Sequence, residues 1–273
     1  MKIIKKQVDI CLFFKSVKEA NERILLLDYD GTLAPFNINR DEAVPYAGIE
    51  DVIDKIMDSE TTRVVIISGQ RIKDLLKLIK FKRRPEIWGS HGWERMMPNN
   101  TYHIEKIQGN ALKALTCVED WLRAEGLAKL CEPKPSSIAL HWRGFSQIEV
   151  EDLHRKVDEH WHRIPHVDEL QLTGFDGGLE IRVPGKNKGH AVKKILSETD
   201  TNSAVAYLGD DKTDEDAFKA LGDTGLCILV REELRPSRAD IWLKPPEELL
   251  FFLDEWLNVC REVRRPNIGS VQK

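Results

Sequence analysis

The sequence predicts an α/β protein with a Rossmann-like parallel-sheet core and an inserted α+β unit. Three short, unbroken apolar runs, at residues 24–27, 64–67 and 204–208, are typical of strands buried on both faces. Each run is followed by a segment with helical spacing of its apolar residues. In the middle of the chain the strand pattern alternates instead, which indicates a sheet with one exposed face. We therefore expect a core of residues 1–95 and 184–273 and an insert of residues 96–183.

Two acids stand at the end of the first apolar run. Asp28 and Asp30 are two positions apart, so in an extended chain both carboxylates point to one side. Gly31 then lets the backbone turn, and Thr32 supplies a hydroxyl and an N–H. Like charges about 4 Å apart repel by roughly 4 kcal/mol at an effective dielectric of about 20, so the pair invites a divalent cation. The alternative, a plain Asp-Gly turn, fits the unbroken apolar run before it less well.

The second apolar run ends in Ser68 and Gly69. The spacing of Ile72, Leu75 and Ile79 predicts a helix that begins just after Gly69. A hydroxyl and free N–H groups at the positive end of a helix form an anion site. The alternative is that Ser68 only caps this helix. With the acid pair of the first run present, we favour phosphate binding.

The third apolar run also ends in acids. Asp210 and Asp211 follow the strand at 204–208, and ligands of open parallel sheets collect at the carboxyl ends of the strands. We therefore expect these acids beside those of the first run. Glu215 and Asp216 lie in the helical turn that follows, where acids commonly cap, and we interpret them as capping residues.

Lys188 stands just before a helix that runs through Val192 and Ile195. The helix dipole does not favour a cation at that end, so a lysine there makes sense if an anion shares the site. The alternative is an ordinary loop lysine.

The remaining elements complete the two units. Strands at 225–230 and 239–243 and a helix at 249–259 are expected to close the core, and a short strand at about 85–89 leads into a glycine-rich turn around His91. In the insert we expect helices over 112–122 and 150–161 and strands over 137–143, 170–172 and 179–183, with a turn at Asp176-Gly177-Gly178 joining the last two.

The composition excludes several classes of function. The net charge of −4 and the scattered basic residues leave no footprint for nucleic acid. No stretch approaches a membrane span, and the apolar patch at 10–14 is too short for a signal peptide. The five cysteines form no C-x-x-C pair, which favours reduced thiols in a cytosolic protein. We expect a cytoplasmic monomer that binds a small molecule.

The motifs together resemble those of the haloacid dehalogenase superfamily of aspartate-nucleophile phosphatases. The string L-L-L-D-Y-D-G-T-L at 25–33 is similar to its first motif, and Ser68, Lys188 and Asp210-Asp211 follow in the order of the other three. The core is therefore expected to be of the haloacid dehalogenase type. The strings G-S-H-G-W-E, E-P-K-P-S-S-I-A-L-H-W-R, L-E-I-R-V-P-G-K-N-K-G and G-D-D-K-T-D-E-D-A-F resemble the trehalose-6-phosphate phosphatase family, in which the insert is a mobile cap.

That resemblance implies a magnesium-dependent phosphatase that hydrolyses trehalose-6-phosphate through an aspartyl-phosphate. Asp28 would be the nucleophile, and Asp30 the general acid and base. The cap would exclude bulk water and test the sugar. The implied ligand sets are Thr32, Ser68, Gly69 and Lys188 for the phosphate; Asp28, the Asp30 backbone carbonyl, Asp210, Asp211 and Asp214 for Mg²⁺; and Glu94, Lys134, His141, Arg143 and Glu180 for the sugar.

The sequence also departs from the family pattern. Ser68-Gly69-Gln70 stands where the family commonly has Ser-Gly-Arg, and Arg71 comes one position late. This change leaves the phosphate chemistry intact but leaves the sugar open. The alternatives are a phosphatase for another glycosyl phosphate, such as that of glucosylglycerate, mannosylglycerate or sucrose, and a sugar-phosphate-binding regulator without catalysis. The intact set of acids and Lys188 argues against the regulator.

Overall fold

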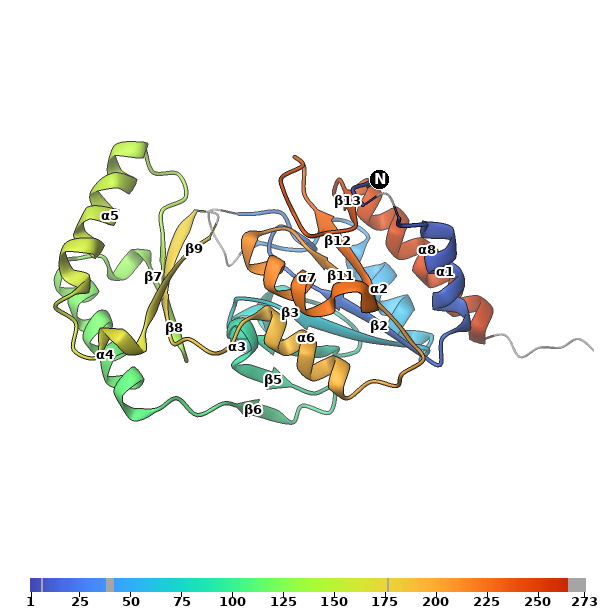
Figure 1. Ribbon diagram of the computed structural model, residues 1–273, viewed down its shortest axis with the longest axis horizontal. Helices are drawn as coiled ribbons and strands as arrows, with labels where there is room; N and C mark the ends of the chain where they lie inside the picture. Colours follow the sequence, from blue (N-terminus) through green and yellow to red (C-terminus); the bar gives the residue numbers. More distant parts are fainter. Residues whose placement is uncertain (6, 38–41, 176, 265–273) are drawn as a thin grey trace, which may run out of the picture.

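The computed structural model describes residues 1–5, 7–37, 42–175 and 177–264, and it consists of two units side by side (Figure 1). The larger unit is a long twisted sheet covered by helices on both faces. The smaller unit is a second sheet with two helices on its outer side, and it is inserted between two halves of the larger one. This architecture confirms the predicted α/β class with an inserted α+β unit.

The sheet of the larger unit has nine strands within the described part of the chain. The six neighbouring central strands are parallel, and the strands outside them pair antiparallel. The three apolar runs of the sequence form adjacent strands in its middle, as predicted. In spatial order the strands are β1 (Lys2–Ile3), β13 (Ile241–Leu243), β12 (Leu226–Val230), β11 (Ser203–Gly209), β2 (Glu22–Leu27), β3 (Thr62–Ile67), β4 (Glu86–Gly89), β5 (Glu94–Met96) and β6 (Tyr102–Ile104).

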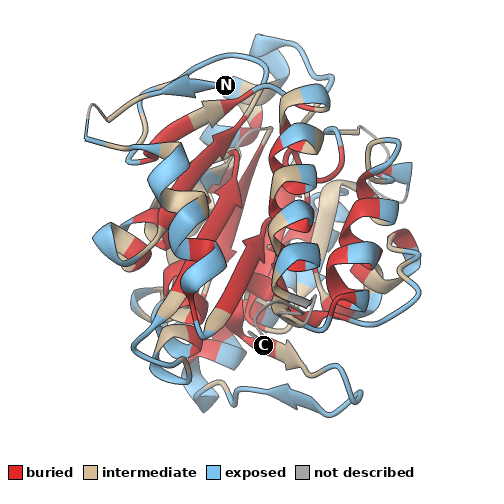
Figure 2. Cartoon of the chain, turned by 90° about the vertical axis from the view of Figure 1, so that its right-hand side faces the viewer, coloured by how far each residue is buried: buried red, intermediate tan, exposed pale blue. Residues whose placement is uncertain are grey.

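Helices bury both faces of this sheet, and Figure 2 shows the buried strands running between them. Alternate residues of a strand point to opposite faces, so Leu25 and Leu27 of β2 pack into one apolar cluster while Ile24 and Leu26 pack into another. The first cluster is covered by α1 (Ile10–Glu19), α2 (Ile49–Asp58), α3 (Ile72–Leu78) and α8 (Glu247–Arg264), and the second by α6 (Lys188–Ser197) and α7 (Glu215–Leu221).

The insert has its own sheet and its own apolar cluster. Its four strands are antiparallel, and its two helices pack their apolar residues into this cluster. Of the turn predicted between its last two strands, Gly177 has a left-handed φ of 82°, whereas Asp176 lies outside the described residues. The elements are α4 (Gly109–Ala124), β7 (Cys131–Lys134), β8 (Ser137–His141), α5 (Gln147–Trp161), β9 (Gln171–Phe175) and β10 (Gly178–Arg182), in the sheet order β7-β8-β10-β9.

The strand pairing adds a detail to the expected boundary between core and insert. The boundary at residue 96 coincides with the end of β5, but β6 pairs with β5 and so belongs to the large sheet. The segment that carries the second sheet therefore begins with α4. Short 3₁₀ turns connect elements in both units, at Ser90–Gly92, Ala128–Leu130, Val167–Glu169, Lys212–Asp214 and Gly222–Thr224.

Two local expectations differ from the structure. The helix after β3 begins at Ile72 with Arg71 at its N-cap, later than the expected start just after Gly69, and this excludes the alternative that Ser68 caps it. Glu215 and Asp216 make tertiary contacts instead of capping α7: Glu215 accepts from Arg235 Nη1 at 2.6 Å, and Asp216 accepts from Asn187 Nδ2 at 2.9 Å. These two hydrogen bonds connect the first turn of α7 to Arg235 and to Asn187.

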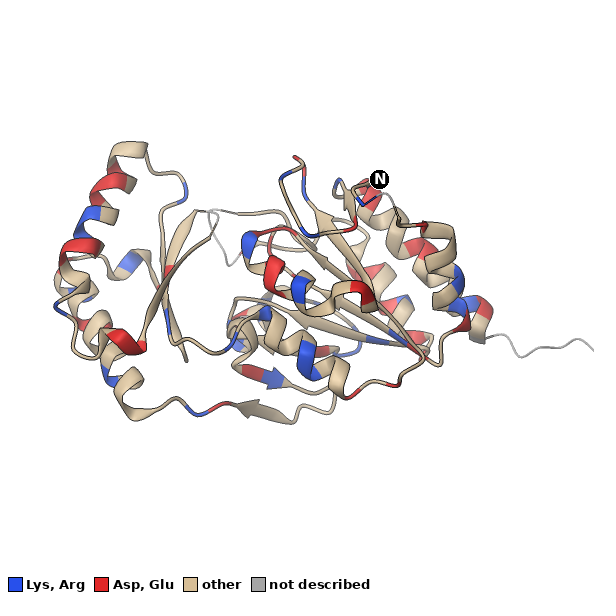
Figure 3. Cartoon of the chain, in the orientation of Figure 1, with Lys and Arg blue, Asp and Glu red and all other residues tan. Residues whose placement is uncertain are grey.

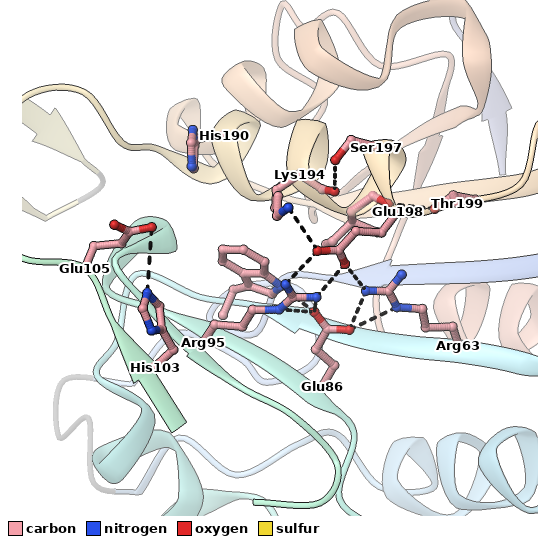
Figure 4. A network of polar contacts seen from close by, with 12 residues as sticks. Arg63, Glu86, Arg95, His103, Glu105, His190, Lys194, Ser197, Glu198 and Thr199 are labelled. Carbon is pink, nitrogen blue, oxygen red and sulfur yellow. Dashed lines mark hydrogen bonds and ion pairs between the residues drawn. The ribbon is translucent and has the colours of Figure 1, made fainter. Parts of the chain in front are cut away.

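A network of charged side chains fastens the two halves of the core together (Figure 4). Glu86 of β4 is 2% exposed and accepts from Arg63 Nη2 at 2.7 Å and Arg95 Nε at 2.9 Å. Glu198, directly after α6, accepts from Arg95 at 2.6 Å and from Arg63 at 3.1 Å. The Arg95 hydrogen bond in particular lowers the pKa of Glu198 to about 2. The network thus joins strands that precede the insert to the helix that follows it.

Charges are otherwise spread over both units. Figure 3 shows both basic and acidic residues on the helices of each unit, in keeping with the scattered pattern of the sequence. In the described ranges, every helix is too short or too polar to cross a bilayer. The five cysteines are all free thiols.

Candidate active site

The acids predicted from separate motifs lie together at the carboxyl ends of β2 and β11. These strands are neighbours, with Leu27 opposite Leu208, so the residues that follow them emerge side by side. The Asp28 N–H donates to the Leu208 carbonyl at 2.9 Å and extends that pairing. A pocket with an empty volume of about 700 Å³ opens above this edge, and residues of both the core and the insert line it.

Asp28 lies at the floor of the pocket and is 2% exposed. Its Oδ1 accepts from Lys188 Nζ at 2.6 Å, and its Oδ2 accepts from Thr32 Oγ1 at 3.2 Å. Burial, and next the nearby Asp214 charge, raises the pKa of Asp28 to about 7, while Lys188 acts in the opposite direction. Such a buried carboxylate with two donors is held in one orientation.

Lys188 begins α6 and is 3% exposed. Its Nζ donates to Asp28 at 2.6 Å and to Asp214 Oδ1 at 2.8 Å. Burial disfavours the ammonium, but the two carboxylates outweigh burial and raise the pKa of Lys188 above its ordinary value. The lysine is therefore a permanent cation in the middle of the acid cluster, which accounts for its place at a helix start.

Asp28, Asp210 and Asp214 form a cluster whose carboxylate oxygens lie within 4.8 Å of one another. Tyr207 Oη donates to Asp214 Oδ1 at 2.6 Å, and the N–H groups of Asp210 and Asp211 donate to its Oδ2 at 3.2 and 3.0 Å. Asp211 lines the pocket without joining the cluster. Asp214, expected only as a metal ligand, thus also organises the turn that carries Asp210.

The cluster fits a hard divalent cation. Among the described side chains, the buried Asp210 Oδ2 makes no hydrogen bond, and Arg231 Nη1 lies 4.0 Å from it. Burial, and next the Asp28 charge, raises the pKa of Asp210 well above its ordinary value. Oxygen-only donor sets of this kind suit Mg²⁺, and a positive ion would relieve the repulsion between the carboxylates.

Asp30 lies at the side of the pocket, and its partner is a residue that the sequence analysis did not assign. Gln70 Nε2 donates to both Asp30 oxygens at 2.8 Å. Burial raises the pKa of Asp30, whereas the Gln70 hydrogen bond and then the Lys188 charge lower it. Asp28 and Asp30 therefore face different surroundings although they are two residues apart.

The loop after β3 brings Ser68 and Gly69 to the same edge. Ser68 is fully buried, and its Oγ accepts from the Gln70 N–H at 3.0 Å. Gly69 lines the pocket, and a Cβ there would come within 2.6 Å of the His91 ring, so a larger residue would displace that ring. Ser68 and Thr32 lie behind the lining residues, where their hydroxyls hold Gln70 and Asp28.

The insert contributes a charged cluster to the opposite wall. Glu180 of β10 accepts from Lys134 Nζ at 3.0 Å and Ser137 Oγ at 2.8 Å, and it pairs with His91 Nε2 of the core at 3.1 Å. Burial opposes ionisation of Glu180, but Lys134 first and then His91 hold its pKa well below the ordinary value. The predicted Lys134 and Glu180 are thus brought together on the pocket wall.

His141 and Arg143, also predicted as sugar contacts, line the same wall. His141 Nε2 lies 3.1 Å from Glu132 Oε2, and the Arg143 guanidinium lies 4.3 Å from the centre of the Phe36 ring. Phe36 comes from the core loop after Asp30, so this cation–π contact crosses from insert to core.

Glu94 is set apart from the other predicted sugar residues. It is 3% exposed, and its carboxylate accepts from Ser90 Oγ at 2.6 Å and Tyr102 Oη at 2.8 Å. Burial, followed by the Glu94 hydrogen bond, raises the pKa of Tyr102 to about 12. The described lining of the pocket does not include Glu94, which instead supports the turn that presents His91.

The sequence analysis assigned no role in the site to several residues that line it. Gln70 was noted only as a departure from a family pattern, and His91 only for the glycines beside it. Glu132 stands two residues before Lys134 in the same string, and this spacing, which puts both on one face of a strand, was the available signal. Phe36 and Phe175 had no distinguishing signal, since single aromatic residues are usually core.

Comparison with solved structures defines the fold. The chain matches the C-terminal domain of C. albicans trehalose-6-phosphate phosphatase with a TM-score of 0.77 and 18% identity, over 94% of this chain and 99% of that one. It matches a haloacid dehalogenase-like hydrolase from B. subtilis with a TM-score of 0.59 and 14% identity, over 85% and 98%. These likenesses establish a fold of the haloacid dehalogenase type, into which the acid cluster at the strand ends fits.

The family follows from the sequence itself. The family profile described as trehalose-phosphatase matches residues 26–240, which is well over half of the chain. This chain therefore belongs to the trehalose-phosphatase family. It is similar to the trehalose-phosphate phosphatase of Mycobacterium marinum, with 29% identity over 226 residues that cover 79% of this chain. The chain spans about half, 55%, of the length of that relative.

Proposed function

We propose that this chain is a phosphatase that hydrolyses trehalose-6-phosphate to trehalose and phosphate through an aspartyl-phosphate. The observation that carries the proposal is the convergence of Asp28, Asp30, Lys188 and Asp210 on one pocket whose far wall is supplied by the insert. Family membership supports the reaction class. The polar wall of the insert supports a substrate with hydroxyl groups to recognise.

In the first step, Asp28 attacks phosphorus and the ester oxygen of the sugar leaves. A new bond forms between a carboxylate oxygen of Asp28 and phosphorus, and the bond to the sugar oxygen breaks. Asp30 donates its proton to that departing oxygen. In the second step, Asp30 takes a proton from water, the water attacks phosphorus, and Asp28 is regenerated with release of phosphate.

Asp28, Asp210 and Asp214, with the Asp30 carbonyl and Asp211 beside them, would hold Mg²⁺. When bound, the ion would supply positive charge that offsets the repulsion between the Asp28 carboxylate and the phosphate dianion. Lys188 adds a second positive charge, with its Nζ 2.6 Å from Asp28 Oδ1. Of the other residues expected to bind the phosphate, Gly69 lines the pocket, whereas Thr32 and Ser68 contact Asp28 and Gln70 from behind it.

The proposal is tested with a panel of sugar phosphates. We expect release of phosphate from trehalose-6-phosphate with Mg²⁺ present, and its loss when EDTA removes the ion, with recovery on adding Mg²⁺ back. The phosphates of glucosylglycerate, mannosylglycerate and sucrose complete the panel. Faster release from one of these would reassign the substrate, and binding without any release would make the chain a sugar-phosphate-binding regulator.

Asp30→Asn is expected to slow turnover about 10²–10⁴-fold, because the amide cannot give a proton to the sugar oxygen or take one from water. Steady-state phosphate release from trehalose-6-phosphate measures the effect, with circular dichroism as a check of folding. A rate equal to that of the wild type would remove the acid and base role from Asp30.

Lys134→Ala is expected to reduce kcat/KM for trehalose-6-phosphate roughly 10-fold or more, since a hydrogen bond to a charged group contributes about 1.5–3 kcal/mol. A small phosphate ester without a second sugar should be affected much less. Lys129→Ala, at an exposed lysine of the same unit, is the control that should leave both rates unchanged. Equal losses on the two substrates would make Lys134 a structural residue of the insert.

A further inference from the structure

The buried side chain of Gln70 connects the loop after β3 to Asp30, which follows β2. The residue is 8% exposed, and its amide nitrogen donates to both oxygens of Asp30 at 2.8 Å. A carboxylate that accepts from one donor on both oxygens cannot rotate about its last bond without losing a hydrogen bond. Asp30 therefore points in a direction that Gln70 sets.

The backbone of Gln70 is itself held from two sides. Its N–H donates to Ser68 Oγ at 3.0 Å, and its carbonyl accepts from the Ser90 N–H at 2.7 Å. Ser68 and Ser90 follow neighbouring parallel strands, β3 and β4. The loop that carries Gln70 is thus fixed to the sheet, and the side chain acts as a rigid arm toward Asp30.

The neighbouring arginine does not share this task. Arg71 Nη1 reaches the Pro133 carbonyl of β7 at 3.5 Å, so it points to the insert and away from Asp30. A neutral amide, and not a guanidinium, is consequently the group that holds Asp30 in this chain.

We propose that Gln70 is a positioning residue that aims the Asp30 carboxyl at the leaving oxygen of the sugar. This inference rests on the proposed role of Asp30 as the group that protonates that oxygen. A misplacement of about 1 Å at a reacting group can cost up to about 100-fold in rate. Its importance depends on the leaving group, because an alkoxide needs a proton when it departs, whereas p-nitrophenolate leaves without one.

The test compares two substitutions that keep the size of the side chain. Gln70→Met removes the donor and leaves an apolar group, and Gln70→Glu replaces the donor by a carboxylate that repels Asp30. First-turnover rates of leaving-group release are measured with enzyme in excess, so that the second step, common to all substrates, does not enter. The substrates are trehalose-6-phosphate and p-nitrophenyl phosphate.

We expect both variants to lower the first-turnover rate on the sugar phosphate about 10- to 100-fold, with KM within about threefold of the wild type. The rate on p-nitrophenyl phosphate should change less than about twofold. Equal losses on both esters, or full activity of Gln70→Met, would overturn the proposal. Failure of both variants to fold would also overturn it, because Gln70 would then be a residue of the fold.

A double-mutant cycle adds a readout that a structural role would not produce. If Gln70 acts only through Asp30, Gln70→Met in an Asp30→Asn background should cost less than about twofold further. Additive losses would contradict that route. Gln147→Leu, at an exposed glutamine of α5 that donates to Glu151 at 2.8 Å, is the matched control and should leave all rates unchanged.

The experiment separates failure of this inference from failure of the proposed function. Absence of phosphate release by the unaltered chain from every sugar phosphate would reject the function. Release by the unaltered chain together with unselective Gln70 variants would reject only the positioning role.

Discussion

Asp28→Asn is expected to abolish phosphate release from every ester, with a loss of roughly 10⁴-fold or more. The amide oxygen is a poor nucleophile and cannot form the acyl phosphate on which both steps depend. The fold should survive, because asparagine keeps the shape of aspartate and an acceptor for Lys188 Nζ. The substitution also removes the repulsion between Asp28 and the Asp214 charge, which helps to raise the pKa of Asp28. Phosphate release and a thermal melt measure the two effects.

Trapping the covalent phosphoryl intermediate tests this prediction directly. Acid quenching during turnover, followed by mass spectrometry of peptides, should find one phosphoryl group on the peptide that contains Asp28 in the wild type and none in the variant. Asp120→Asn, at an exposed aspartate of α4 paired with Arg123 at 3.1 Å, is the control and should turn over normally. Activity of Asp28→Asn close to that of the wild type would show that another group attacks phosphorus.

Lys188→Met is expected to lower the free energy of unfolding by about 3–5 kcal/mol, because it leaves the buried Asp28 and Asp214 carboxylates without their common cation. The measurement is denaturant unfolding in EDTA, so that no divalent ion can replace the lost charge. Phosphate release with Mg²⁺ present should also be lost, since the cation facing the phosphate is gone.

Lys194→Met provides the comparison on the same helix. Lys194 is about half exposed and lies 3.4 Å from Glu198, an arrangement that contributes only about 0.3–0.5 kcal/mol. Similar losses of stability in the two variants would mean that helix propensity or packing, and not the buried charge, explains the effect of Lys188→Met.

The sequence was sufficient for the central sheet and for the acid edge. The runs ending before Asp28, Ser68 and Asp210 are buried on both faces, and burial is what makes such runs continuous in a sequence. Because these runs become adjacent parallel strands, their terminal polar residues must meet. Asp28 and Asp210 therefore lie together because the strands before them are parallel neighbours, and both strands can be recognised in the sequence.

Edge elements and side-chain directions were not predictable in the same way. β7 contains Pro133, which argues against a strand, yet β7 is an edge strand and needs no ladder N–H at that position. The turn at Ser90 and His91 has left-handed φ values of 48° and 55°, which sequence patterns do not indicate for these residue types. That turn sets the direction of the His91 side chain. It also places the Ser90 N–H against the Gln70 carbonyl and so helps to orient Gln70.

The charged network of Glu86, Arg63, Arg95 and Glu198 has a consequence for how this architecture can change over time. It closes the core on the side away from the pocket, and it uses no residue of the segment between β6 and α6. The inserted segment likewise packs around an apolar centre almost entirely its own. Under the proposed function, a different insert joined at the same two points would change the wall of the pocket that meets the sugar and leave the acids of the core in place.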